Sequence, residues 1–339
     1  MNNFAYTKAK DVTQAISQLS GSVGNKIVAG GTNINDLLKY YVTTADKLVD
    51  INPFIEHHTI MPLENGGMRL GALVTNADTA YHPEIEAKYP LLSKAILAGA
   101  SAQIRNMATN GGNLMQRTRC YYFYDVNTPC NKREPGSGCS AVSGYNRIHA
   151  ILGQSESCIA VFPSDMCVAL AALEATVNIT GPDGDRVLAF ADFHRLPGDT
   201  PHVDNDLKHG EVITGIDLPI KGFEKNYSYL KLRDRASYSF ALVSVATGLD
   251  LDGTVINEAR IALGGLAHKP WRVTEAEEYL KRKEATPENF ASAADIFLEG
   301  AYGYEHNSFK ISLAKKAIIR NCMMALQPES QRPGAQPSL

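Results

Sequence analysis

Short apolar runs alternate with turn residues along the first part of the chain. Helical spacing covers Asp11–Leu19, and the apolar run Lys26–Ala29 predicts a buried strand that ends at Gly30-Gly31. A second strand is expected at Asp46–Ile51. The first strand therefore leads directly into a glycine turn, whose backbone N–H groups are exposed to whatever lies above it.

The same arrangement recurs further along the chain. A strand is expected at Met68–Val74, N-cap residues at Thr75–Asp78 open a helix, and the apolar spacing of Tyr89–Gly99 is helical. The residues Asn110-Gly-Gly-Asn113 then form a second glycine turn. The two glycine pairs are thus separated by a domain's length of strands and helices.

Residues 119–157 lose this periodicity and are rich in Pro, Gly, Asn and Ser. A loop of that length without helices or strands of its own is usually functional. Helical spacing returns at Ser164–Leu173, and a hairpin with strands at 175–180 and 185–188 follows.

A third unit begins near Asn226. Three strands are expected at 227–232, 241–249 and 258–267, and three helices at 275–283, 287–298 and 308–326. The tail, residues 327–339, is rich in Pro, Gln and Ser, and such a segment buries too little apolar surface to fold. We therefore expect the tail to be disordered.

The composition of the 339 residues is that of an ordinary globular protein, with 44% hydrophobic and 20% charged residues. A formal net charge of -3 provides no basic surface for nucleic acid, and no run of about 18 apolar residues could span a bilayer. We expect neither a nucleic-acid partner nor membrane insertion. The first residues lack the charged leader and apolar core of an export signal, so the chain is expected to carry none of its own.

Four of the six cysteines fall in the aperiodic loop: Cys120, Cys130, Cys139 and Cys158. Disulfide scaffolds belong mainly to small secreted domains, so metal-binding thiolates explain these residues better in a long chain. Intervals of 9, 8 and 18 residues lack the close cysteine pairs of zinc fingers and ferredoxins. The spacing therefore supports a cysteine-ligated metal or cluster without identifying which. Cys322 lies in an apolar helical run and is expected to be a core thiol.

Further motifs stand in order around the two glycine pairs. They are Val28–Ile34, Gln103–Leu114, Asp165, Glu211–Pro219, Lys231 and Gly264–Arg272. Together they resemble the FAD-binding medium subunit of the xanthine dehydrogenase and carbon monoxide dehydrogenase family, the molybdenum hydroxylases, over nearly the whole chain. Neither glycine pair has the spacing of a Rossmann site or a P-loop, so those two nucleotide folds are disfavoured.

The resemblance implies a vanillyl-alcohol-oxidase-like (PCMH-type) FAD-binding fold. This fold is α+β, has two subdomains, and is followed by a C-terminal α+β domain of the CO dehydrogenase flavoprotein type. We place the subdomains at residues 1–57 and 58–222, with an insertion at about 115–160 in the second. The C-terminal domain covers residues 223–326 and precedes the tail at 327–339.

The resemblance also implies which residues bind FAD, and it places no catalytic residue on this chain. The first glycine turn would wrap the pyrophosphate with its N–H groups, using Ile27, Val28, Ala29, Gly30, Gly31, Thr32, Asn33 and Ile34. The diphosphate, the ribityl chain and other parts of the cofactor would be contacted by Thr109, Gly112, Asn113, Asp165, Ile213 and Lys231. One departure from the family motif is Asn110, which stands where an apolar residue is usual.

The cysteine-rich loop is an insertion relative to simpler family members. It is similar to the insertions of 4-hydroxybenzoyl-CoA reductase and, more closely, periplasmic aldehyde oxidoreductase, which hold an extra [4Fe–4S] cluster. A cubane needs four converging thiolates, which would be Cys120, Cys130, Cys139 and Cys158. Cys167 lies in an apolar helix and is expected to be packed, with its use in place of Cys158 as the alternative. A structural zinc on the same four cysteines is a second alternative.

The function that the resemblance implies is that of an electron-transfer flavoprotein subunit. Electrons would come from a molybdenum-cofactor large subunit and a [2Fe–2S] small subunit that oxidise an aldehyde to a carboxylic acid. They would leave through [4Fe–4S] and FAD to an external acceptor. The alternatives are a 4-hydroxybenzoyl-CoA-reductase-like subunit and a zinc-stapled assembly protein. Export with a signal-bearing partner would place the heterotrimer in the periplasm, and otherwise it would be cytoplasmic.

Overall fold

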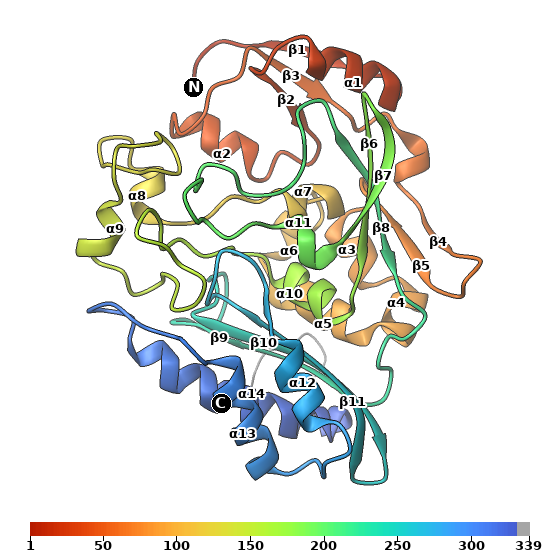
Figure 1. The fold of residues 1–339 in the computed structure, drawn as a ribbon. Coiled ribbons are helices and arrows are strands. Elements are labelled where there is room, and N and C mark those ends of the chain that lie inside the picture. The colour runs from red at the N-terminus through yellow and green to blue at the C-terminus, as the bar shows by residue number, and fades with distance from the viewer. Residues whose placement is uncertain (331–339) are drawn as a thin grey trace.

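Three β-sheets, one in each of three consecutive parts of the chain, organise the computed structural model (Figure 1). The structure describes residues 1–330. The tail expected to be disordered differs from that expectation at its start, where Pro328–Ser330 form the 3-10 helix η2. The remainder of the tail, residues 331–339, lies outside the described residues.

The N-terminal part is a three-stranded parallel sheet in the order β1-β3-β2. Its elements are β1 (Ala5–Lys8), α1 (Val12–Ser20), β2 (Asn25–Val28), α2 (Ile34–Lys39), β3 (Lys47–Asp50) and the 3-10 helix η1 (Ile55–His57). Helix α1 begins after Asp11, whose side chain accepts a hydrogen bond from the N–H of Gln14. The predicted helix and first strand are therefore confirmed to within one residue.

The second part contains a five-stranded sheet in the order β4-β5-β8-β6-β7. The strands are β4 (Ile60–Pro62), β5 (Met68–Gly71), β6 (Thr176–Gly181), β7 (Gly184–Ala189) and β8 (Val212–Leu218). The expected strand at 68–74 ends earlier, because Leu73 hydrogen-bonds to His57 outside the ladder. Strand β8, at the centre of the sheet, was not among the strands expected from the sequence.

The second part also contains helices. They are α3 (Asn76–Ala80), α4 (Pro83–Lys88), α5 (Pro90–Ala98), α6 (Ala102–Arg105), α7 (Asn110–Leu114), α10 (Asp165–Ala172) and α11 (Phe190–Phe193). All eight residues of α10 are buried, because the helix lies between α5 and the next sheet and is apolar nearly all round. Helix α10 therefore joins the second and third parts in one core.

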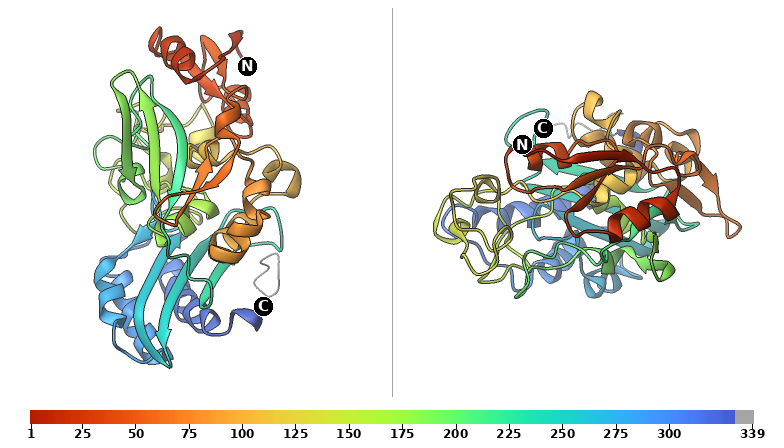
Figure 2. Two further views of the ribbon diagram at one scale, coloured as in Figure 1. Left: turned by 90° about the vertical axis from the view of Figure 1, so that its right-hand side faces the viewer. Right: turned by 90° about the horizontal axis from the view of Figure 1, so that it is seen from above.

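The C-terminal part has an antiparallel sheet in the order β12-β11-β10-β9. Its strands are β9 (Tyr227–Leu232), β10 (Val243–Asp252), β11 (Val255–Gly264) and β12 (Trp271–Arg272), and its helices are α12 (Thr274–Leu280), α13 (Pro287–Phe297) and α14 (Phe309–Ala325). Helix α14 packs against β9 and β10, and Figure 2 shows these helices at the end of the molecule away from the N-terminal sheet. Cys322 is buried in α14, as expected of a core thiol. No helix within residues 1–330 is long and apolar enough to cross a bilayer.

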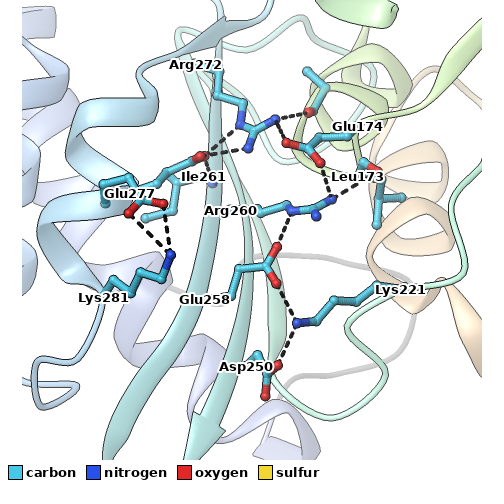
Figure 3. Close-up of polar contacts among 12 residues, drawn as sticks. Leu173, Glu174, Lys221, Asp250, Glu258, Arg260, Ile261, Arg272, Glu277 and Lys281 are labelled. Carbon is cyan, nitrogen blue, oxygen red and sulfur yellow. Dashed lines mark hydrogen bonds and ion pairs between the residues drawn. The ribbon is translucent and has the colours of Figure 1, made fainter.

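Ion pairs connect the C-terminal sheet to the second part of the chain (Figure 3). Arg260 of β11 and Arg272 of β12 both bind the carboxylate of Glu174, at 2.9 and 2.8 Å. Lys221 bridges Asp250 and Glu258 at 2.6 and 2.5 Å. Shared partners of this kind hold the two parts in one orientation.

The cysteine segment, residues 115–160, forms a lobe beside the N-terminal part (Figure 1). Apart from the short helices α8 (Tyr121–Tyr124) and α9 (Ser140–Ser143) it is irregular. It has a small core of its own around Phe123, which is completed by Leu37 and Val42 of the N-terminal part. The segment is therefore ordered by packing rather than by periodic structure.

Candidate functional site

The two glycine turns lie against each other, although they are far apart in the sequence. A Cβ atom on Gly30 would stand 1.7 Å from the carbonyl oxygen of Met107, just before the second turn. Gly31 has a φ of +71°, a backbone conformation that residues other than glycine rarely adopt. Both glycines are thus required by the backbone, and their turn remains open on the side away from Met107.

That open side faces a cavity of about 560 Å³, the glycine-loop cavity. Ten of the fourteen residues predicted to bind the cofactor line it: Ile27, Ala29, Gly30, Gly31, Thr32, Asn33, Ile34, Thr109, Gly112 and Ile213. Val28 points instead into the small core with Leu38 and Leu48. The volume is in the range of cofactor sites.

Polar side chains of both glycine motifs lie at the wall of the cavity. The side chain of Thr109 caps α7 by accepting the N–H of Gly112 at 3.2 Å. Asn33 accepts the N–H of Arg117 at 3.0 Å, while its own buried Nδ2 has no hydrogen-bond partner within residues 1–330. A buried amide without a partner is costly, and a bound acceptor group would satisfy it.

Asn110 shows why a polar residue is tolerated in the second turn. Its side chain is fully buried and hydrogen-bonds to Asn76, Thr79 and the carbonyl of Gly71. A buried amide is stable when its donors and acceptors are all used. The departure from the family motif is therefore compensated locally, and the glycine pair keeps its place.

A second cavity of about 320 Å³, the interdomain cavity, lies between the cysteine segment and the C-terminal sheet. Its walls come from the cysteine segment, from the start of α10 and from the C-terminal part, and they include Arg119, Tyr121, Ser164, Asp165, Phe240 and Gly265. Asp165, a predicted cofactor contact, thus lies in this cavity and not in the glycine-loop cavity.

Asp165 is held by two partners from strand β9. Lys231 Nζ lies 2.7 Å from one carboxylate oxygen, and the Tyr229 hydroxyl donates to the other at 2.6 Å. Lys231 is 2% exposed and lines neither cavity. Its observed role is to neutralise Asp165, while burial and the carboxylate raise the pKa of Tyr229 well above its usual value.

Asn113 lies between residues that line the two cavities. Its Oδ1 accepts hydrogen bonds from the Ser164 hydroxyl at 2.6 Å and from Gln116 at 2.7 Å. The preceding residue, Gly112, lines the glycine-loop cavity, whereas Ser164 lines the interdomain cavity. A ligand longer than either cavity would pass this point.

The four loop cysteines line a third, small cavity in the cysteine segment. Cys120, Cys130 and Cys158 are buried and Cys139 is partly exposed, while Cys130 and Cys139 lie opposite each other in an isolated β-bridge. Cys167 lies outside this cavity, fully buried in α10. No group of three or more His, Cys, Asp or Glu side chains within residues 1–330 is arranged to hold a single metal ion. A cubane poses a different requirement, because each cysteine binds a different iron.

The cysteine cavity lies in an apolar setting with one buried cation. Burial raises the pKa of the Cys120 thiol to about 12 and that of Cys158 to about 11, with the charge of Lys132 acting in the opposite direction on Cys158. Lys132 is 3% exposed, and its Nζ lies 2.6 Å from Asp204 Oδ1. Arg117 binds the other oxygen of Asp204 at 2.6 Å.

Sequence reasoning missed this ionic group and the histidine at the cysteines. Asp204 comes from an irregular stretch with no motif, and Lys132 belongs to no motif of its own. His149 places Nε2 3.1 Å from Cys120 Sγ, although its sequence context shows no ligand spacing. These contacts join residues 29 to 87 positions apart, so no local pattern records them.

Comparisons with known proteins agree with this geometry. Residues 2–221 match the FAD binding domain in molybdopterin dehydrogenase, and residues 227–320 match the CO dehydrogenase flavoprotein C-terminal domain. The chain is 44% identical over 319 residues to the aldehyde oxidoreductase FAD-binding subunit PaoB of Escherichia coli (strain K12), covering 94% of this chain and 96% of that one. It is 28% identical to the glyceraldehyde dehydrogenase medium chain of Sulfolobus acidocaldarius, covering 81% and 80%.

Solved structures show the same architecture. The chain superposes on quinoline 2-oxidoreductase from Pseudomonas putida 86 with a TM-score of 0.74 and 25% identity, covering 96% and 98% of the two chains. Carbon monoxide dehydrogenase from Hydrogenophaga pseudoflava gives 0.75 at 23% identity, covering 96% and 97%, which supports the fold alone. The predicted α+β fold with its flavoprotein C-terminal domain is therefore confirmed. The two glycine turns, the cavity that they line and the matched domains show that this chain belongs to the family of FAD-binding subunits of the molybdenum hydroxylases.

Proposed function

We propose that the chain binds one FAD across both cavities and serves as the electron-transfer flavoprotein subunit of a molybdenum-containing aldehyde oxidoreductase. The observation that carries this proposal is that the two cavities flank Asn113: the neighbouring Gly112 lines the glycine-loop cavity, and Ser164, which donates a hydrogen bond to Asn113, lines the interdomain cavity. A dinucleotide would use the first cavity for its pyrophosphate, at the glycine turns, and the second for its flavin ring. The relative at 44% identity, an aldehyde oxidoreductase subunit, supports the assignment to aldehydes.

The chain's own groups can bind and orient the cofactor. The turn at Gly30 and Gly31 offers backbone N–H groups without side chains that would block a phosphate. The unpaired Nδ2 of Asn33 adds a side-chain donor, and the Asp165–Lys231 pair leaves the interdomain wall without net charge. Bound FAD would supply the exchange of electron pairs, and the protein would position and shield it.

We further propose that the cysteine segment holds a [4Fe–4S] cluster on Cys120, Cys130, Cys139 and Cys158. All four line one cavity, and thiolate is the ligand that such clusters use. The buried Lys132 beside them would offset part of the cluster's negative charge. Cys167 is not proposed as a ligand because it is packed in the core that joins the second and third parts.

The proposed assembly is a heterotrimer with a molybdenum-cofactor large subunit and a [2Fe–2S] small subunit, delivering electrons to an external acceptor. Names such as medium chain and FAD-binding subunit among the relatives support membership of a multi-subunit enzyme. We propose a periplasmic location, reached by export with a signal-bearing partner. Cell fractionation with and without that partner tests the location, and retention in the cytoplasm when the partner is present would contradict it.

The experiment that tests the function is the purification of the co-expressed complex, followed by its absorption spectrum and flavin, iron and sulfide contents. Flavin bands, a broad iron–sulfur shoulder and bleaching on addition of an aldehyde are expected. Ser variants of the four loop cysteines should lose iron, while Cys167→Ser and Cys322→Ser should keep it. A colourless preparation that contains zinc would refute the proposal, and reduction by an aromatic acyl-CoA system alone would redirect it to the reductase alternative.

A further inference from the structure

We propose that His149 donates a hydrogen bond from Nε2 to Sγ of Cys120 and thereby raises the reduction potential of the cluster on the four cysteines. The inference rests on the proposed function, since it requires the cluster. The two atoms are 3.1 Å apart, and His149 is 1% exposed. Water therefore does not compete for this contact.

The direction of the hydrogen bond follows from the chemistry of the two groups. A cysteine sulfur that binds iron has lost its proton and can only accept. The imidazole must then be the donor, with its proton on Nε2. Nδ1 of His149 is buried without a hydrogen-bond partner within residues 1–330, so nothing there holds a proton on the other nitrogen.

The backbone of His149 is fixed from the C-terminal part of the chain. Its carbonyl oxygen accepts hydrogen bonds from Lys310 Nζ at 2.8 Å and from Asn307 Nδ2 at 3.2 Å, and both donors are fully buried. Its N–H donates to the carbonyl of Asn146 at 3.0 Å. The ring also lies beside Tyr122, with centroids 6.3 Å apart. The donor is therefore held in place against Cys120 before any cluster is bound.

A hydrogen bond to a ligating sulfur draws negative charge away from the cluster. The reduced cluster carries one more negative charge than the oxidised cluster, so the bond stabilises the reduced form more. Removing the donor is therefore expected to lower the reduction potential without removing a ligand. His149 is in this sense a positioning residue that acts through Cys120.

The test is a potentiometric titration of the purified complex, with the reduced cluster followed by EPR. His149→Phe keeps a flat ring without a donor, His149→Gln keeps an N–H donor, and His58→Phe changes an exposed histidine of another part as a control. We expect full iron and sulfide in all three variants. The midpoint potential should be lower in His149→Phe, closer to that of the unchanged protein in His149→Gln, and unchanged in His58→Phe.

An unchanged midpoint in His149→Phe with full iron would overturn the inference. Loss of iron from both His149 variants would also overturn it, because it would identify a ligand or a structural prop. Pulsed EPR of the unchanged complex with ¹⁵N-labelled histidine needs no variant. A weak nitrogen coupling supports the hydrogen bond, whereas no coupling, or the strong coupling of a nitrogen bound to iron, refutes it. Absence of iron from the unchanged complex would instead refute the proposed cluster.

Discussion

Lys132 Nζ, at the wall of the cysteine cavity, lies 2.6 Å from Oδ1 of Asp204, which lines the glycine-loop cavity. Burial alone would raise the pKa of Asp204, but the charges of Lys132 and Arg117 outweigh it and hold that pKa well below its usual range. A single, largely buried carboxylate thus links the wall of one cavity to the wall of the other.

Replacing Lys132 by Met is expected to destabilise the protein strongly. The largely buried Asp204 would keep Arg117 as its one remaining partner with a full positive charge, and breaking a buried pair costs about 3–5 kcal/mol. Denaturant unfolding measures the change. The matched control is Lys315→Met, which breaks an exposed pair with Asp295 and should cost at most about 1 kcal/mol. Equal small effects for both variants would contradict the prediction.

A methyl group on Gly30 is expected to abolish flavin binding. In Gly30→Ala the new Cβ would meet the Met107 carbonyl at 1.7 Å, so one of the two glycine turns must move. The flavin content of the purified protein measures the effect. Gly21→Ala places its Cβ no closer than 3.5 Å to any neighbour and should keep wild-type flavin. Normal flavin in Gly30→Ala would mean that the two turns need not touch.

The buried histidine His194 should make the protein less stable in acid. Its ring lies among Phe162, Phe190 and Phe193, and burial lowers its pKa to about 4. Between this value and the ordinary histidine pKa the unfolded chain binds more protons, so the free energy of unfolding falls as the pH falls through that window.

His194→Gln should therefore lose less stability than the unchanged protein between pH 7 and pH 4, with a difference of about 3 kcal/mol. Denaturant unfolding at several pH values in this range measures the slope. The exposed His58→Gln is the control and should follow the unchanged protein. Parallel slopes for all three proteins would show that His194 is not held neutral.

Arg260 and Arg272 should be energetically coupled because they share Glu174 (Figure 3). Each arginine holds the carboxylate in place for the other, so the double Met variant should be less destabilised than the sum of the single variants. Coupling of about 0.5–3 kcal/mol is expected in a double-mutant cycle of unfolding free energies. Additive effects within error would indicate that the two pairs form independently.

The sequence predicted those elements in which the spacing of apolar residues is regular or is clearly interrupted. The first glycine turn, the helix α10 and the irregular cysteine segment all have such patterns, and the structure has each of them. The second glycine pair, expected in a turn, lies instead in the short helix α7. Strand β8 was missed because its place depends on pairing with β5 and β6, which lie far away in the chain. Backbone hydrogen bonds between strands that are distant in the sequence leave no recognisable pattern within either strand.

The residues of the candidate site also differ in whether a local motif predicts them. Gly30 and Thr109 were identified by their motifs and line the glycine-loop cavity, whereas Lys231, also expected to contact the cofactor, lines neither cavity and is paired with Asp165. Asp204 and His149 had no motif at all. Asp204 meets Lys132 only when the cysteine segment packs against the rest of the second part, and His149 meets Cys120 only when the cysteine segment itself folds.

The ion pair between Lys132 and Asp204 also constrains how the cysteine segment can be gained or lost in evolution. A descendant that deleted the cysteine segment would lose the lysine and keep an acidic side chain inside the wall of its flavin pocket. Loss of the segment should therefore be accompanied by a neutral residue at position 204 or by a new basic neighbour. The cysteine segment and Asp204, which lies outside it, are therefore expected to change together.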